Sequence, residues 1–164
     1  MIRQVVLTAA VVGSVAVGVA TANASGVTEG SATDSAHAQK TWRPVQVIGA
    51  LRRAGLPIGR VRYYTAANDV NKLLGRPGQY IGKANFRDTR IRSTGFDVDD
   101  GGSVETFANK GDAARRYRYV DAVTNSSSLF VEYHYLEGTV FLRLSHELTP
   151  AQAKQYERAF RKAV

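Results

Sequence analysis

The sequence FVEYHYLEGTVFLRLS at residues 130–145 decides the fold of this chain. Apolar and polar residues alternate in two segments, Phe130–Leu136 and Thr139–Ser145, and Glu137 and Gly138 between them are typical of a tight turn. Because alternate side chains lie on the same side of a strand, Val140, Leu142 and Leu144 form one apolar side. The stretch therefore predicts two antiparallel strands with one face against a core.

Three helices are expected around this hairpin. Thr149 and Gln152 have the spacing of a capping box, which predicts a helix from Pro150 to about Lys162 with Ala153, Tyr156 and Phe160 as its buried stripe. A helix over Pro44–Ala54 is expected to end at Gly55. Asn109 is expected to cap a helix over Lys110–Val123. In this last helix the apolar spacing predicts that four residues face inward (Ala113, Tyr117, Val120, Val123) and that three face outward (Arg115, Arg116, Arg118).

Further strands are expected over Gly59–Thr65 and Tyr80–Arg87. A hairpin of Phe96–Val98 with Ser103–Phe107 is also expected, and Thr89–Thr94 either prolongs the preceding strand or begins another. Pro77 and Gly78 predict a type II turn over residues 76–79. The sequence thus predicts an α+β fold, an antiparallel sheet of about five strands with two or three helices packed on one face.

The N-terminal residues predict export. Residues 1–24 contain Arg3, an uncharged apolar run and the small residues Ala22-Asn23-Ala24, the features of a cleavable signal peptide. Residues 25–40 are small and polar and predict a disordered tether, followed by a single globular domain over residues 41–164. The chain has no cysteine, which excludes disulfides and a lipid-bearing cysteine. We therefore expect a secreted, extracellular protein, with association with the cell wall as a further option and no transmembrane segment after cleavage.

The formal net charge of +8 favours acidic partners. Basic residues are concentrated between residues 60 and 92, where aromatic residues are interleaved with them. Phosphates attract such cations and aromatic rings can stack on bases or sugars, although a solvated strand face gives the same pattern. The residues predicted to form a face for an anionic ligand are Arg76, Tyr80, Lys83 and Arg87.

The sequence contains no motif for catalysis, a metal or a cofactor. His134 and His146 have no evident third ligand and are expected at the surface or rim. Asp97–Gly102 lacks the spacing of a calcium-binding loop and favours a hairpin turn. No serine lies in a G-x-S-x-G elbow. Paired carboxylates distant in sequence leave a weak hydrolase as a third option.

Three segments resemble an uncharacterised family of small secreted proteins and lipoproteins of actinomycete bacteria. They are Asn71–Tyr80, Gly101–Phe107, and the C-terminal region that contains Glu132–Tyr135 and Leu148–Gln152. The resemblance implies export but no activity and no functional residue. Some members look lipid-anchored through a cysteine that this chain lacks.

These features together predict a secreted, non-enzymatic module that binds an anionic cell-envelope polymer or a protein partner. Nucleic acid stays open as an alternative partner. The second hypothesis is a secreted inhibitor of an extracellular enzyme, with Asn68–Tyr80 as an exposed wedge.

Overall fold

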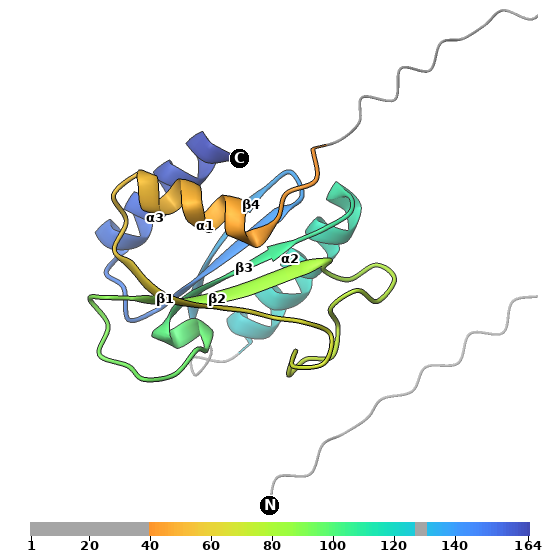
Figure 1. Cartoon of the computed structure of the whole chain (residues 1–164), viewed down its shortest axis with the longest axis horizontal. Coiled ribbons are helices and arrows are strands. Elements are labelled where there is room, and N and C mark those ends of the chain that lie inside the picture. Colours follow the sequence, from red (N-terminus) through yellow and green to blue (C-terminus); the bar gives the residue numbers. More distant parts are fainter. Residues whose placement is uncertain (1–39, 127–130) are drawn as a thin grey trace, which may run out of the picture. The chain divides into compact units, whose positions relative to one another are not determined.

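A five-stranded antiparallel sheet forms the centre of the fold (Figure 1). The computed structural model describes residues 40–126 and 131–164, so the predicted signal peptide and nearly all of the predicted tether lie outside the described residues. The strands follow the order β1-β2-β3-β5-β4 across the sheet. Their bounds are β1 Ile58–Tyr63, β2 Gly82–Asp88, β3 Gly101–Thr106, β4 Glu132–Glu137 and β5 Val140–Ser145.

The hairpin predicted from the C-terminal stretch is confirmed as β4 and β5. Tyr135 pairs with Leu142 and Tyr133 with Leu144. Gly138 has a φ of 54°, a conformation that glycine adopts without the strain of a side chain. The turn residues thus set the register that places Leu142 and Leu144 in the core.

Three α-helices and one short 3₁₀-helix complete the described part of the fold. They are α1 Pro44–Arg53, the 3₁₀-helix η1 Val98–Asp100, α2 Lys110–Asn125 and α3 Pro150–Ala163. The predicted caps are confirmed, because Asn109 accepts a hydrogen bond from the amide of Asp112 and Thr149 accepts one from the amide of Gln152. None of the helices in residues 40–126 and 131–164 has the length and apolar character that a membrane span requires.

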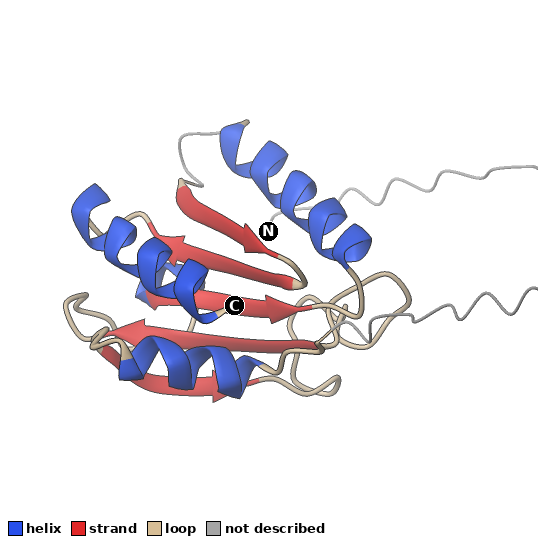
Figure 2. Cartoon of the chain, turned by 90° about the horizontal axis from the view of Figure 1, so that it is seen from above, coloured by secondary structure: helices blue, strands red, loops and turns tan. Residues whose placement is uncertain are grey.

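Helices α1 and α3 lie side by side on the first face of the sheet (Figures 1 and 2). The apolar side of each strand contributes to this main core, together with the inner stripe of each helix. The helix residues in it include Val47, Ile48 and Leu51 from α1 and Ala153, Tyr156 and Phe160 from α3. The stripe predicted for the last helix is therefore confirmed.

Helix α2 covers the second face of the sheet, over β4 and β5. Ala113 and Val120 of α2 form a smaller core with Tyr80, Phe107 and Phe141. The predicted α+β fold is confirmed, with two helices sharing one face. The third helix lies on the opposite face because β5 alternates Phe141 against Leu142, which makes both faces partly apolar.

The predicted hairpin of residues 96–107 is wrong. Residues 98–100 form η1, and β3 pairs with β2 and β5 instead of with a strand of its own hairpin. Residues 89–94 form no strand. The glycines that suggested a turn serve close packing instead, since a Cβ atom on Gly102 would lie 2.6 Å from the carbonyl oxygen of Arg143. The middle of the sheet therefore accepts no side chain at that position.

Candidate functional site

A buried ion pair joins α2 to the second face of the sheet. Arg116 donates from Nε to Oε2 of Glu105 at 2.9 Å and from Nη2 to Oε1 at 3.1 Å. Glu105 lies in the middle strand β3 and is fully buried, while Arg116 is only 9% exposed. Both side chains lie between α2 and the sheet. The guanidinium therefore supplies the hydrogen bonds that the carboxylate loses from water on burial.

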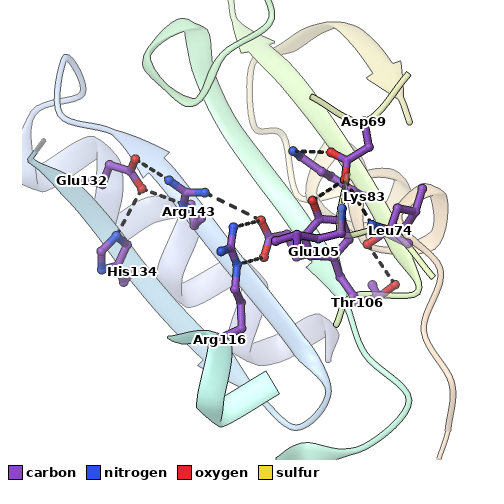
Figure 3. Close-up of polar contacts among 12 residues, drawn as sticks. Asp69, Leu74, Lys83, Glu105, Thr106, Arg116, Glu132, His134 and Arg143 are labelled. Atoms are coloured by element: carbon purple, nitrogen blue, oxygen red, sulfur yellow. Dashed lines mark hydrogen bonds and ion pairs between the residues drawn. The ribbon is translucent and has the colours of Figure 1, made fainter. Parts of the chain in front are cut away.

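A second arginine extends this pair into a network (Figure 3). Arg143 of β5 donates from Nε to Oε2 of Glu132 at 2.8 Å and from Nη2 to Oε1 at 2.6 Å. Its Nη1 lies 3.7 Å from Oε1 of Glu105. His134 contacts Glu132 at 3.2 Å and Asp121 of α2 at 3.3 Å. Acidic and basic groups therefore alternate across β3, β5, β4 and α2.

The network shifts the protonation equilibria toward the charged forms. Burial alone would raise the pKa of Glu132, but hydrogen bonds from His134 and Arg143 lower it below its usual value. Burial opposes the charge of Arg116, yet the Glu105 carboxylate raises the pKa of that guanidinium. The Glu132 carboxylate is therefore ionised at neutral pH.

A cavity of about 620 Å³ lies over this network. Its charged lining residues are Arg115, Arg116, Glu132 and Arg143. Other lining residues come from α2 and from the segment before β2, residues 64–81, which connects β1 to β2. They are Asn71, Leu73, Gly78, Gln79, Tyr119, Val120, Val123 and Thr124.

Asp69 holds the segment before β2 against the sheet. Its Oδ2 accepts hydrogen bonds from the amides of Leu73 and Leu74 and from the hydroxyl of Tyr80, and its Oδ1 pairs with Nζ of Lys83 at 3.1 Å. Burial opposes the charge of Asp69, but these hydrogen bonds lower its pKa to about 2. One carboxylate thus fixes both ends of the segment.

The four residues predicted to form an anionic-ligand face do not share one surface. Tyr80 is fully buried and Lys83 nearly so, and both are bound to Asp69. Arg76 is exposed at a turn in which the amide of Gln79 donates to the carbonyl of Arg76 and Gly78 has a φ of 72°. Arg87 is half-buried in β2. The predicted turn is confirmed, but Tyr80 and Lys83 cannot contact a polymer at the surface.

A different set of basic residues gathers on the half of the second face near β1. Arg62 places its guanidinium carbon 4.4 Å from the centre of the Phe96 ring, and Arg60 places its own 5.7 Å from the same ring. Both arginines are exposed, and neither forms an ion pair with any described residue. Strand alternation puts Arg87 on the same face, because Arg62 pairs with Asn85 two residues before it. We call Arg60, Arg62, Arg87 and Phe96 the arginine face.

One of the two histidines, His134, differs from expectation. His146 is exposed as predicted, but the side chain of His134 is buried beneath α2, where Tyr117 and Phe141 contact its ring edge-on. Asp97 to Asp100 form the start and body of η1 instead of a hairpin turn. Within residues 40–126 and 131–164, no three His, Asp or Glu side chains converge as metal ligands do.

The outward orientation predicted for Arg116 is wrong, because its side chain is buried against Glu105, and the network was not predicted for that reason. The signal was present, since Arg116 stands three residues after Ala113 and four before Val120, within the buried stripe. An arginine in such a stripe indicates a carboxylate across from it. Glu105 was the matching residue, in a strand whose six residues are all buried.

The comparisons with known proteins supply no relative. No family model, no curated protein and no solved structure matches this chain.

Proposed function

We propose that this protein is an exported, non-enzymatic module that binds an anionic polymer of the cell envelope through the arginine face. One observation carries the proposal. Arg60 and Arg62 are exposed, hold no ion pair among the described residues and lie over the ring of Phe96. Export rests on the first 24 residues of the sequence.

The arrangement suits a polyanion. A guanidinium that no carboxylate neutralises keeps its donors for phosphate or carboxylate groups of a ligand. Contact with Phe96 restrains both side chains, which reduces the entropy that each loses on binding. Arg87 adds a third cation on the same face, and the net charge of +8 favours the approach of a polyanion.

Binding to isolated cell envelope across a salt series tests the proposal. The wild-type chain is compared with an Arg60→Ala/Arg62→Ala variant and with an Arg118→Ala/Arg158→Ala control. The control removes the same charge from exposed positions on α2 and α3. We expect binding to fall steeply with salt. The slope of log K against log salt concentration should become shallower by about two only in the Arg60→Ala/Arg62→Ala variant, which loses two cationic contacts.

Equal losses in the two variants would show attraction by net charge alone and would overturn the arginine face as a site. The absence of binding at low salt would overturn the polymer as the partner.

A second candidate function, a secreted inhibitor of an extracellular enzyme, is favoured by Val70. Its side chain is 85% exposed, although the neighbouring Asp69 is buried and bound to four groups. A rigid segment that presents an apolar residue resembles a wedge for an enzyme cleft. Assays of secreted proteases and β-lactamases with wild-type and Val70→Asp protein test this function. Inhibition that Val70→Asp abolishes would support it, and uniform inactivity would exclude those two classes of enzyme as targets.

A further inference from the structure

We infer that the cavity between α2 and the segment before β2 binds a small amphiphilic anion, a molecule with an oxyanion head group and an apolar body. The head group is a carboxylate or a phosphate. It binds to Arg116 and Arg143, and the body lies against α2 and the segment before β2. This site lies outside the arginine face and does not depend on the proposed function.

The hydrogen-bond donors of the two arginines carry the inference. Arg116 and Arg143 both line the cavity, and each uses Nε and Nη2 for its glutamate partner. No described residue accepts a hydrogen bond from Nη1 of either arginine, and Nη1 of Arg143 stays 3.7 Å from the nearest carboxylate oxygen. Each guanidinium has five N–H groups, so donors remain on both.

Every carboxylate oxygen of Glu105 and Glu132 already accepts a hydrogen bond from an arginine. Both carboxylate oxygens of Glu105 accept from Arg116, and both of Glu132 accept from Arg143. One oxygen of Glu132 also contacts His134. A cationic ligand would have to share carboxylate oxygens that already accept from an arginine, while an anion would find Nη1 groups from which no described residue accepts. This difference favours an oxyanion over a cation.

The walls of the cavity suit an apolar body. Leu73 comes from the segment before β2, and Val120 and Val123 come from α2. Val123 is 42% exposed and Tyr119 of the same helix is 63% exposed, so apolar surface is open to solvent at the cavity. A ligand that covers this surface gains the free energy of its removal from water. A volume of about 620 Å³ is within the range of small-molecule sites.

Titration calorimetry of the full chain with four probes of equal chain length tests the inference. The probes are octanoate, octyl phosphate, octylamine and octanol, all used below their micelle concentrations. We expect octanoate, octyl phosphate or both to bind, and the tighter of the two identifies the preferred head group. Octylamine and octanol are expected to bind at least about tenfold more weakly, because they lack the oxyanion.

Two variants locate the binding. Val123→Glu places a negative charge beside the apolar wall at a partly exposed position, and we expect it to weaken binding of the anionic probe about tenfold. Arg116→Lys keeps the charge beside Glu105 but removes the guanidinium fork, and we expect a comparable loss. The Arg118→Ala/Arg158→Ala variant is the control and should keep the wild-type Kd.

Several results would overturn the inference. They are no binding of either anion, equal binding of all four probes, or an unchanged Kd in Val123→Glu. Because Arg60→Ala/Arg62→Ala leaves the cavity intact, its effect on envelope binding reports on the proposed function alone.

Discussion

Arg116 of α2 donates two hydrogen bonds to the Glu105 carboxylate of β3, of 2.9 and 3.1 Å. The pair lies between a helix and the central strand of the sheet, where folding removes most of the water from both charges. Such a pair contributes little net free energy compared with apolar residues of the same volume, but the loss of one partner leaves a buried charge uncompensated.

We predict that Glu105→Gln lowers the free energy of unfolding by about 3–5 kcal/mol, because the charge of Arg116 is then unpaired in the interior. Urea unfolding measures the change. The double variant Glu105→Leu/Arg116→Met should recover most of the loss. The exposed pair of Glu157 and Arg161 supplies the control, since Glu157→Gln should cost less than about 1 kcal/mol. A double variant less stable than Glu105→Gln would contradict the prediction.

Asp69 should make stability depend on acid. Its pKa is lowered from 3.8 to about 2 in the folded protein. A lowered carboxyl pKa stabilises the fold above the unfolded value, and this contribution is lost as the pH falls from about 4 to about 2. The contribution at neutral pH is about 2 kcal/mol.

Unfolding of wild type and Asp69→Asn across this pH range measures the contribution. We expect the difference in free energy of unfolding between the two proteins to shrink toward pH 2. A difference that stays constant with pH would mean that the charge of Asp69 is not stabilising.

Two buried serines should respond to alanine in opposite directions. Ser103 Oγ has no hydrogen-bond partner among the described residues, so Ser103→Ala removes a desolvated hydroxyl and should raise the free energy of unfolding by up to about 1 kcal/mol. Ser145 Oγ donates to the carbonyl of Asp99 at 2.8 Å and accepts from the amide of Glu147 at 3.1 Å. Ser145→Ala should therefore lower it by about 1 kcal/mol. Thermal unfolding of both variants checks the signs, and destabilisation by Ser103→Ala would show that its hydroxyl is satisfied.

Substitution of two glycines by alanine should change stability in opposite directions. A Cβ on Gly102 would lie 2.6 Å from both the carbonyl oxygen of Arg143 and the ring of Phe86, so Gly102→Ala should lower stability by more than about 2 kcal/mol. A Cβ on Gly49 in α1 would meet only the end of the Arg53 side chain, at 3.4 Å. Gly49→Ala should raise stability by about 0.5–1 kcal/mol through helix propensity. Chemical denaturation compares them, and similar effects of the two variants would be inconsistent with this packing.

The sequence predicted those parts of the fold that depend on neighbouring residues. The caps at Asn109 and Thr149, the turn at Pro77 and Gly78 and the β4–β5 hairpin all follow from local chemistry. The pairing of β3 with β2 and β5 was not predicted, because it depends on how strands distant in sequence assemble.

The candidate sites were harder to predict for the same reason. Arg116 was expected to face solvent, since hydrophobic periodicity treats every arginine as an outer residue, and its carboxylate partner lies in another element. Tyr80 and Lys83 were expected at a surface, and Asp69 holds both in the interior. Charge in a sequence does not show which groups pair across the fold. The grouping of Arg60 and Arg62 with Phe96 likewise joins separate segments.

The two faces of the sheet should differ in how they tolerate single substitutions. On the face covered by α1 and α3, apolar side chains of similar volume can replace one another singly. On the face covered by α2, Glu105 and Arg116 depend on each other, as do Glu132 and Arg143. A change at one of these positions is deleterious until its partner also changes. In a library of random variants, these four positions should therefore show strong pairwise epistasis, while the apolar positions of the opposite face accumulate independent substitutions.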